Sequence, residues 1–282
     1  MPKRVLPSWV DNNDAIQRVT DYLLSHWSKA AAIRNADRSK VEALVETYLR
    51  GRTRKSPADI VRLLQQAPGA APIQQALEAG VVGSLIEEAA VIEESVGVLA
   101  GSLSLPTPLA AAWANQHALN LAQYLTQQQE QTITSLLLRA LNGTEPRNGL
   151  DLAPLILQSV DLTPQQAAWV ANLHQRLTSR GVPQSRIDAE VDAFAGRLRR
   201  QRATTIGRTE INRALLHGRV MAWDQAEQDG WMTGMRKEWL TAPGCCDKPK
   251  GGCASLNGQS IGLPDDFSTP WGFVEGPQSG HP

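Results

Sequence analysis

The stretch from Arg202 to Asp247 reads RATTIGRTEINRALLHGRVMAWDQAEQDGWMTGMRKEWLTAPGCCD. Its first half has the three-to-four-residue spacing of an amphipathic helix, with Thr204 or Thr205 available as the N-cap. The predicted inner face of this helix consists of Ile211, Ala214, Leu215, Gly218 and Ala222. Gly230 is expected to supply the left-handed residue at the helix end. Beyond it the period changes to alternation, which predicts a strand over 235–240.

The sequence before this stretch is dominated by helix patterns. Thr163, Pro164 and Gln166 predict a capping box with proline at the first helical position. Because Val182 and Pro183 follow a glycine, another helix is expected to begin there and to end in a basic turn near residue 202. Further predicted helices cover 11–34, 39–49, 73–99 as one or two helices, and 109–141.

The sequence after residue 247 is rich in Gly, Pro, Asp and Ser, and Asn257-Gly258 predicts a hairpin turn between two short extended segments. The predicted fold class is therefore mainly α, with an extended helical body and a small irregular α+β module at the carboxyl end. We expect a helical amino-terminal region over 1–160 and a carboxyl-terminal module over 161–282. Within this module, helices are expected over 164–229 and strands and loops over 230–282.

The composition argues against a global affinity for nucleic acid or membranes. The 282-residue chain has 28 basic and 28 acidic residues, so no overall positive field would attract an anionic partner. It lacks an apolar run of about 18 residues, and its first residues do not resemble a signal peptide. We expect a soluble protein in a cytoplasm-like compartment without membrane contact, and any contact with nucleic acid must be local.

The order of several short motifs near the carboxyl end resembles the phage head morphogenesis family, the minor head proteins similar to the F protein of phage Mu. The resemblance covers roughly the last 80 to 110 residues, and the order of the motifs is more specific than any single one. Its principal residues are Arg208-Thr209-Glu210, Ala214, Gly218, Trp223, Arg236-Lys237, Trp239, Leu256-Asn257-Gly258-Gln259 and Gly280-His281-Pro282. We take Arg208, Thr209, Glu210, Trp223 and Trp239 as the signature residues.

The resemblance implies a structural protein of a tailed bacteriophage virion and no enzymatic activity. Such a minor capsid protein joins the head during assembly in the host cytoplasm, near the portal or the inner capsid surface. The implied partners are the portal protein, the major capsid protein and sister subunits, so a homo-oligomer is one expectation. The alternative is an internal DNA-binding protein that is packaged and ejected with the double-stranded genome.

A structural zinc site is a second hypothesis. Cys246, Cys253 and His281 are three candidate ligands, and Cys245 or a downstream cysteine is the candidate fourth. Bound metal would stabilise a segment that has few large aliphatic residues. The alternative is a set of reduced thiols without metal. Family members continue after the His-Pro pair into a Cys-Arg-Cys-like segment, whereas this sequence ends at Pro282, so we expect a truncated or processed form or an incomplete site.

The basic cluster before the signature suggests a contact surface. Its members Arg197, Arg199, Arg200 and Arg202 could contact DNA phosphates without sequence preference, or an acidic surface of a partner protein. An ordinary solvated helix face is the third interpretation. The segment lacks the interleaved aromatic residues that single-stranded nucleic acid requires.

The signature residues themselves are expected to be structural. Glu210 is predicted to pair with Arg213 at three residues' spacing, because such residues are neighbours on a helix surface. A catalytic role would need a second acid or base and a pocket, and nothing in the sequence fixes them. Arg-Thr-Glu also resembles a fragment of the ADP-ribosyltransferase motifs, but the accompanying Ser-Thr-Ser and Glu-x-Glu elements are missing. Most of four tryptophans are expected to be buried where the signature helix packs on the strand at 236–240; the four are Trp223, Trp231, Trp239 and Trp271.

Overall fold

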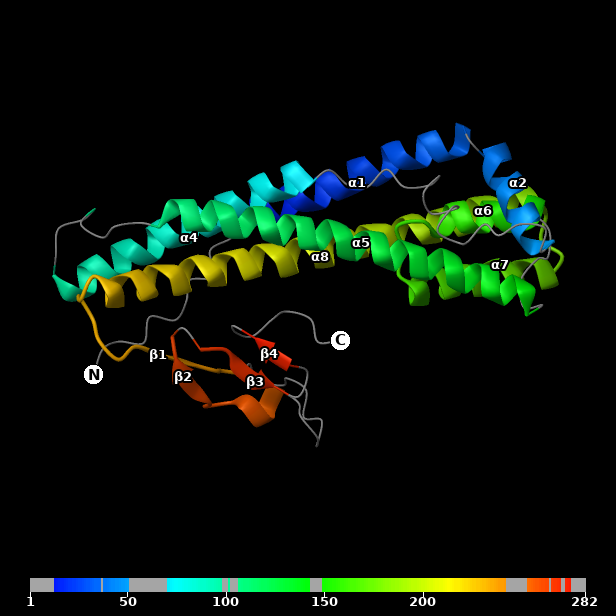
Figure 1. The fold of residues 1–282 in the computed structure, drawn as a ribbon. Coiled ribbons are helices and arrows are strands. Elements are labelled where there is room, and N and C mark those ends of the chain that lie inside the picture. The colour runs from blue at the N-terminus through cyan, green and yellow to red at the C-terminus, as the bar shows by residue number, and fades with distance from the viewer. Residues whose placement is uncertain are drawn as a thin grey trace. The chain divides into compact units, whose positions relative to one another are not determined.

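A computed structural model describes residues 13–36, 38–50, 70–97, 101, 106–142, 149–241, 253–263, 265–269 and 272–274 (Figure 1). Within these residues the chain is mainly α, with a few short strands near its carboxyl end, which confirms the predicted fold class. The α-helices are α1 (Asn13–Ala36), α2 (Arg38–Leu49), α4 (Ala70–Val96), α5 (Thr107–Leu141), α6 (Gly149–Ser159), α7 (Pro164–Ser179) and α8 (Gln184–Gln228). The remaining elements are β1 (Arg236–Glu238), the 3-10 helix η1 (Cys253–Leu256), β2 (Ser260–Gly262), β3 (Phe267–Thr269) and β4 (Gly272–Val274).

The chain divides into two compact units, each built from separate segments. Unit 1 is drawn from Met1–Ala15, Gln74–Gln116 and Arg208–Pro282, and unit 2 from Ile16–Ile73 and His117–Gly207. Helices α5 and α8 each contribute one end to either unit. The boundary expected near residue 160 follows the chain linearly, whereas these units interleave segments from before and after that residue.

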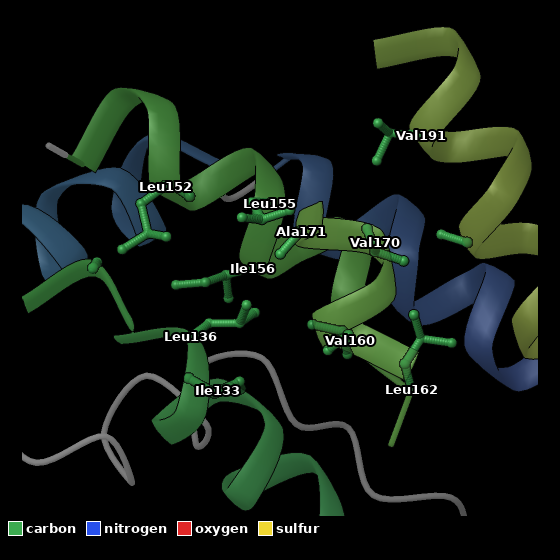
Figure 2. Packing of buried hydrophobic residues seen from close by; sticks show 14 of the residues in the cluster. Ile133, Leu136, Leu152, Leu155, Ile156, Val160, Leu162, Val170, Ala171 and Val191 are labelled. Carbon is green, nitrogen blue, oxygen red and sulfur yellow. The ribbon is translucent and has the colours of Figure 1, made fainter. Parts of the chain in front are cut away.

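Unit 2 has an aliphatic core formed by α2, α6, α7 and the facing parts of α5 and α8 (Figure 2). Side chains from α5 and α6 meet in it, as Leu136 and Ile156 show. Val160 and Leu162, in the link from α6 to α7, are also fully buried. Helix α6, which the sequence patterns did not predict, contributes Leu152, Leu155 and Ile156 to this core. Burial of such side chains stabilises a fold by about 1.5 to 3 kcal/mol each.

The predicted capping box of α7 is confirmed. The Thr163 hydroxyl accepts a hydrogen bond from the Gln166 amide at 3.2 Å, and the Gln166 side chain accepts one from the Thr163 amide at 3.1 Å. Pro164 occupies the first helical position, where no amide hydrogen is needed. The helix closes at Gly181, whose positive φ of 68° fits a left-handed C-terminal residue.

Replacing Thr163 by alanine is expected to lower the free energy of unfolding of unit 2 by about 1 kcal/mol, because the Gln166 amide loses its acceptor, the Thr163 hydroxyl. Thermal melting followed by circular dichroism measures the change. Thr178→Ala is the control, since the exposed Thr178 hydroxyl bonds only to a carbonyl of the same helix. Equal melting temperatures for the two variants would contradict the assigned role of Thr163.

Helix α8 corrects the prediction of two helices separated by a cap at Thr204 or Thr205. Both hydroxyls donate backward to the carbonyls four residues earlier, at 3.0 Å each, and cap nothing. Helix-interior threonine commonly makes this bond. The buried face continues through Ala203 and Ile211, both fully buried, so packing carries the helix past the expected break. The predicted 73–99 segment is likewise one helix, α4.

The strands form two small antiparallel pairs, β1 with β2 and β3 with β4. The strand predicted over 235–240 is confirmed as β1. The Asn257-Gly258 hairpin prediction is wrong, because a 3-10 helix precedes the turn and β2 pairs with β1. Gly258 has a φ of 81°, and the Asn257 side chain accepts hydrogen bonds from the Thr241 amide and hydroxyl at 2.9 and 3.0 Å. This amide therefore anchors the chain that leaves β1.

Candidate functional site

The Arg208-Thr209-Glu210 motif lies within α8, in unit 1. Glu210 is buried, with 6% of its surface exposed, and its carboxylate lies 3.3 Å from the Arg213 guanidinium. This pair confirms the predicted spacing of three residues on one helix face. Arg208 is exposed and Thr209 is half-buried. The motif thus contributes a buried, paired carboxylate to its own helix.

Gly218, another residue of the family resemblance, lies where α8 crosses α4 at very short range. A Cβ atom at this position would overlap the Val81 carbonyl oxygen and would lie 3.1 Å from the Leu85 nitrogen. Beside it, the Ser84 hydroxyl donates to the Leu215 carbonyl at 2.8 Å. Because only glycine lacks a Cβ, this residue lets the two helix backbones come together.

The signature tryptophan Trp223 makes a polar contact across the same two helices. Its indole Nε1 donates to Glu88 of α4 at 2.8 Å, and the Glu88 carboxylate also lies 3.6 Å from Arg219. Around this contact α4 and α8 bury an apolar cluster formed by Leu85, Ala89, Ile92, Ala222 and Ala226. Trp231 and Met232 pack against its edge. One carboxylate of α4 therefore holds two side chains of α8.

Sequence patterns did not identify the partners of the signature segment in unit 1. Ser84 and Glu88 lie in α4, a helix that was predicted from its composition alone. Their spacing of four residues places both on one face of that helix, and this spacing was the one sequence feature that could have indicated a shared partner. Trp113 of α5 stacks on His217, with ring centroids 4.5 Å apart and an interplanar angle of 16°. This stack places the imidazole of His217 against an aromatic ring from a distant part of the sequence.

The predicted single tryptophan cluster is wrong, because the tryptophans divide between two cores. Trp239 is 2% exposed and meets the Phe267 ring edge-on at 5.2 Å, with Leu256 beside them. Trp223 and Trp231 instead pack partly buried against α4 and α8. Trp271 lies outside the described residues. The β pairs thus have their own small aromatic core.

The arginines of the basic cluster have different environments, all within unit 2. Arg197 and Arg200 are exposed. Arg199 donates to the carbonyls of Gln158 and Val160 at the end of α6. Arg202 is only 7% exposed. Arg199 therefore holds the carboxyl end of α6, where helix carbonyls lack intrahelical partners.

Arg202 is the most constrained of these arginines. Its guanidinium donates to the Asp161 carbonyl at 2.6 Å and to Gln128 Oε1 at 2.8 Å, and lies 5.8 Å from the centre of the Trp27 ring. Burial lowers the pKa of Arg202, an effect that the nearby Asp161 carboxylate opposes. Asp161 has a positive φ of 67°, so Arg202 holds a backbone conformation that few residues adopt.

The predicted zinc ligands cannot be placed together. Cys245, Cys246 and His281 lie outside the described residues, and Cys253 begins η1 without a described side chain. Among the side chains that are described, no group of three His, Cys, Asp or Glu residues is arranged to hold a metal ion. The zinc site stays a prediction.

A groove between α7 and the first half of α8 has a volume of about 550 Å³. Its apolar lining comes from Trp169, Leu173 and Phe194, and its charged lining includes Arg176 and Arg197. Trp169 is 45% exposed, an unusual position for so large an apolar ring. The Arg197 guanidinium lies 5.6 Å from the centre of the Phe194 ring. The groove combines aromatic surface with positive charge.

Comparisons with known proteins give no family assignment, because no family model, curated protein or solved structure matches this chain. None of the described helices has both the length and the apolar content needed to cross a lipid bilayer.

Proposed function

We propose that this chain is a structural minor head protein of a tailed bacteriophage. It would join the head during assembly in the host cytoplasm and reside in the virion near the portal or the inner capsid surface. The proposal starts from the ordered motifs that resemble the phage Mu F-like family. The observation that supports it best is that the described signature side chains are mostly engaged in packing unit 1.

Each of these contacts suits a structural role. Glu210 is buried against Arg213, Gly218 permits the close crossing of α4 and α8, and Trp223 bonds to Glu88 across that crossing. Trp239 forms the centre of the β-strand core. Residues that pack the unit they belong to suit a structural role better than a part in a chemical reaction.

The alternative, an internal DNA-binding protein, draws on the arginine cluster. The guanidinium groups of Arg199 and Arg202 donate hydrogen bonds to backbone carbonyls within unit 2. The exposed members of the cluster are therefore Arg197 and Arg200. A protein that neutralises few phosphates binds DNA weakly at physiological salt, because each phosphate contact contributes to counterion release. We therefore favour protein partners.

The test is co-expression of the chain with the portal and major capsid proteins of the same phage, followed by sedimentation of the assembled particles. We expect the chain to sediment with the particles after nuclease treatment and at raised salt. Gly218→Val, which disrupts the α4–α8 crossing, is expected to abolish this association, whereas the exposed variant Arg208→Ala should retain it. Release by nuclease or by moderate salt would favour the DNA alternative, and absence from particles would contradict both.

A further inference from the structure

The outward face of α4 is apolar, although it is exposed. Ile86 is 51% exposed and Val91 is 38% exposed, and Ala90 is exposed between them. The other side of the same helix is buried against α8 through Leu85 and Ile92. Neighbouring apolar side chains that are exposed on one side of a helix often mark an interaction surface. The outward face therefore has the character of a surface that another element covers.

The same face carries only negative charge. Helix α4 contains five glutamates and no lysine or arginine. Two of these carboxylates act inside unit 1, since Glu88 binds Trp223 and Arg219, and Glu93 accepts a hydrogen bond from the Gly101 amide at 2.8 Å. Glu87 and Glu94 are exposed beside Ile86 and Val91. A partner of this face must offer apolar surface and positive charge together.

The α7–α8 groove offers this combination. Trp169, Leu173 and Phe194 supply apolar surface, and Arg176 and Arg197 are exposed at its walls. Its acidic lining residue, Glu190, forms an ion pair at 3.0 Å with Arg186 of the same helix, so the charge of that carboxylate is partly offset. An amphipathic helix with an acidic margin fits such a groove.

We propose that the α4 face of one copy docks into the α7–α8 groove of a second copy. Both complementary surfaces belong to the same chain, and this identifies the occupant as another molecule of this protein. DNA would meet the positive charge but would leave the apolar lining of the groove and the acidic face of α4 without partners. Because the two contacting surfaces differ, the interface is heterologous, and repeated contacts give rings or open chains.

Paired charge-reversal variants test this contact in the full-length chain. The groove variant Arg176→Glu/Arg197→Glu keeps an intact α4 face, and the α4 variant Glu87→Arg/Glu94→Arg keeps an intact groove. Analytical ultracentrifugation over a concentration series is expected to show reversible self-association of the wild type. Each variant alone should associate at least tenfold more weakly, because like charges then face each other across the contact.

An equal mixture of the two variants is expected to recover self-association, because opposite charges again face each other in both contacts. The native α4 face of the groove variant meets the native groove of the α4 variant, and the reversed α4 face meets the reversed groove. Arg200→Glu is the control, since it reverses an exposed charge of α8 outside the groove lining, and it should associate as the wild type does. Circular dichroism verifies that every variant keeps its helix content, and a variant that loses it is replaced by the milder Arg197→Ala or Glu87→Ala.

Four results would overturn the proposal. The first is a wild-type chain that stays monomeric at every concentration tested. The second is self-association that neither variant changes. The third is a mixture of the two variants that remains monomeric. The fourth is a groove variant whose only defect is weaker binding to a double-stranded DNA fragment.

Discussion

Replacing Gly218 by alanine is expected to destabilise unit 1 by about 2 kcal/mol, although alanine is the better helix former by about 1 kcal/mol. The added Cβ would overlap the Val81 carbonyl oxygen, and backbone cannot move aside as a side chain can. Helices α4 and α8 must therefore separate. The Ser84 to Leu215 hydrogen bond and the contact between Trp223 and Glu88 would weaken with them.

Hydrogen exchange of the α4 amides measures this effect most directly. A loss of about 2 kcal/mol corresponds to roughly thirtyfold faster exchange when opening of the helix pair limits exchange. The control is Gly196→Ala in the same helix, where a Cβ would meet no atom within 4 Å. That variant should be neutral or slightly more stable. Equal exchange rates in the two variants would show that the helices do not meet at Gly218.

Replacing Arg202 by methionine is expected to lower the free energy of unfolding of unit 2 by about 3 kcal/mol. Methionine retains the apolar part of the side chain but leaves the Asp161 carbonyl and Gln128 Oε1 without their charged donor. It also removes the cation above the Trp27 ring. Loss of these partners frees the strained backbone at Asp161 and the end of α6.

Thermal melting of the full-length chain measures the loss, which corresponds to a fall of roughly 6 to 12 °C for a unit of this size. Arg200→Met is the matched control, because Arg200 is exposed on the same helix and its replacement should change stability by less than about 0.5 kcal/mol. Arg202→Lys should be intermediate, since an ammonium group keeps the charge but not the paired geometry. Similar melting temperatures for Arg200→Met and Arg202→Met would contradict the role assigned to Arg202.

The environments of Arg199 and Arg202 differ from what the arginine cluster suggests in the sequence. On the sequence, four arginines within six positions suggest a surface for an anionic partner. In the structure, Arg199 reaches carbonyls at the end of α6, and Arg202 reaches the Asp161 carbonyl in the link between α6 and α7. These acceptors lie about 40 positions earlier in the chain. A positive charge at the carboxyl end of a helix is favourable, so these residues stabilise unit 2 directly.

Local patterns predicted the elements that local chemistry controls. The capping box at Thr163 and the left-handed glycine at Gly230 follow from hydrogen bonds between neighbouring residues, and both are confirmed. The pair of Glu210 and Arg213 follows from helix geometry in the same way. The hairpin at Asn257-Gly258 failed because β1, from another part of the chain, provides the partner strand for β2.

The sequence by itself determined the helix-dominated class, most helix positions and the residues that mark the signature segment, since these depend on period, caps and composition. Only the tertiary structure decided that α8 continues past Thr204, that Gly218 meets Val81, and that Arg202 is buried. These three features depend on atoms brought together from segments more than 40 positions apart. No local propensity encodes such contacts, because they arise when buried faces pack and each backbone carbonyl and charge must find a partner.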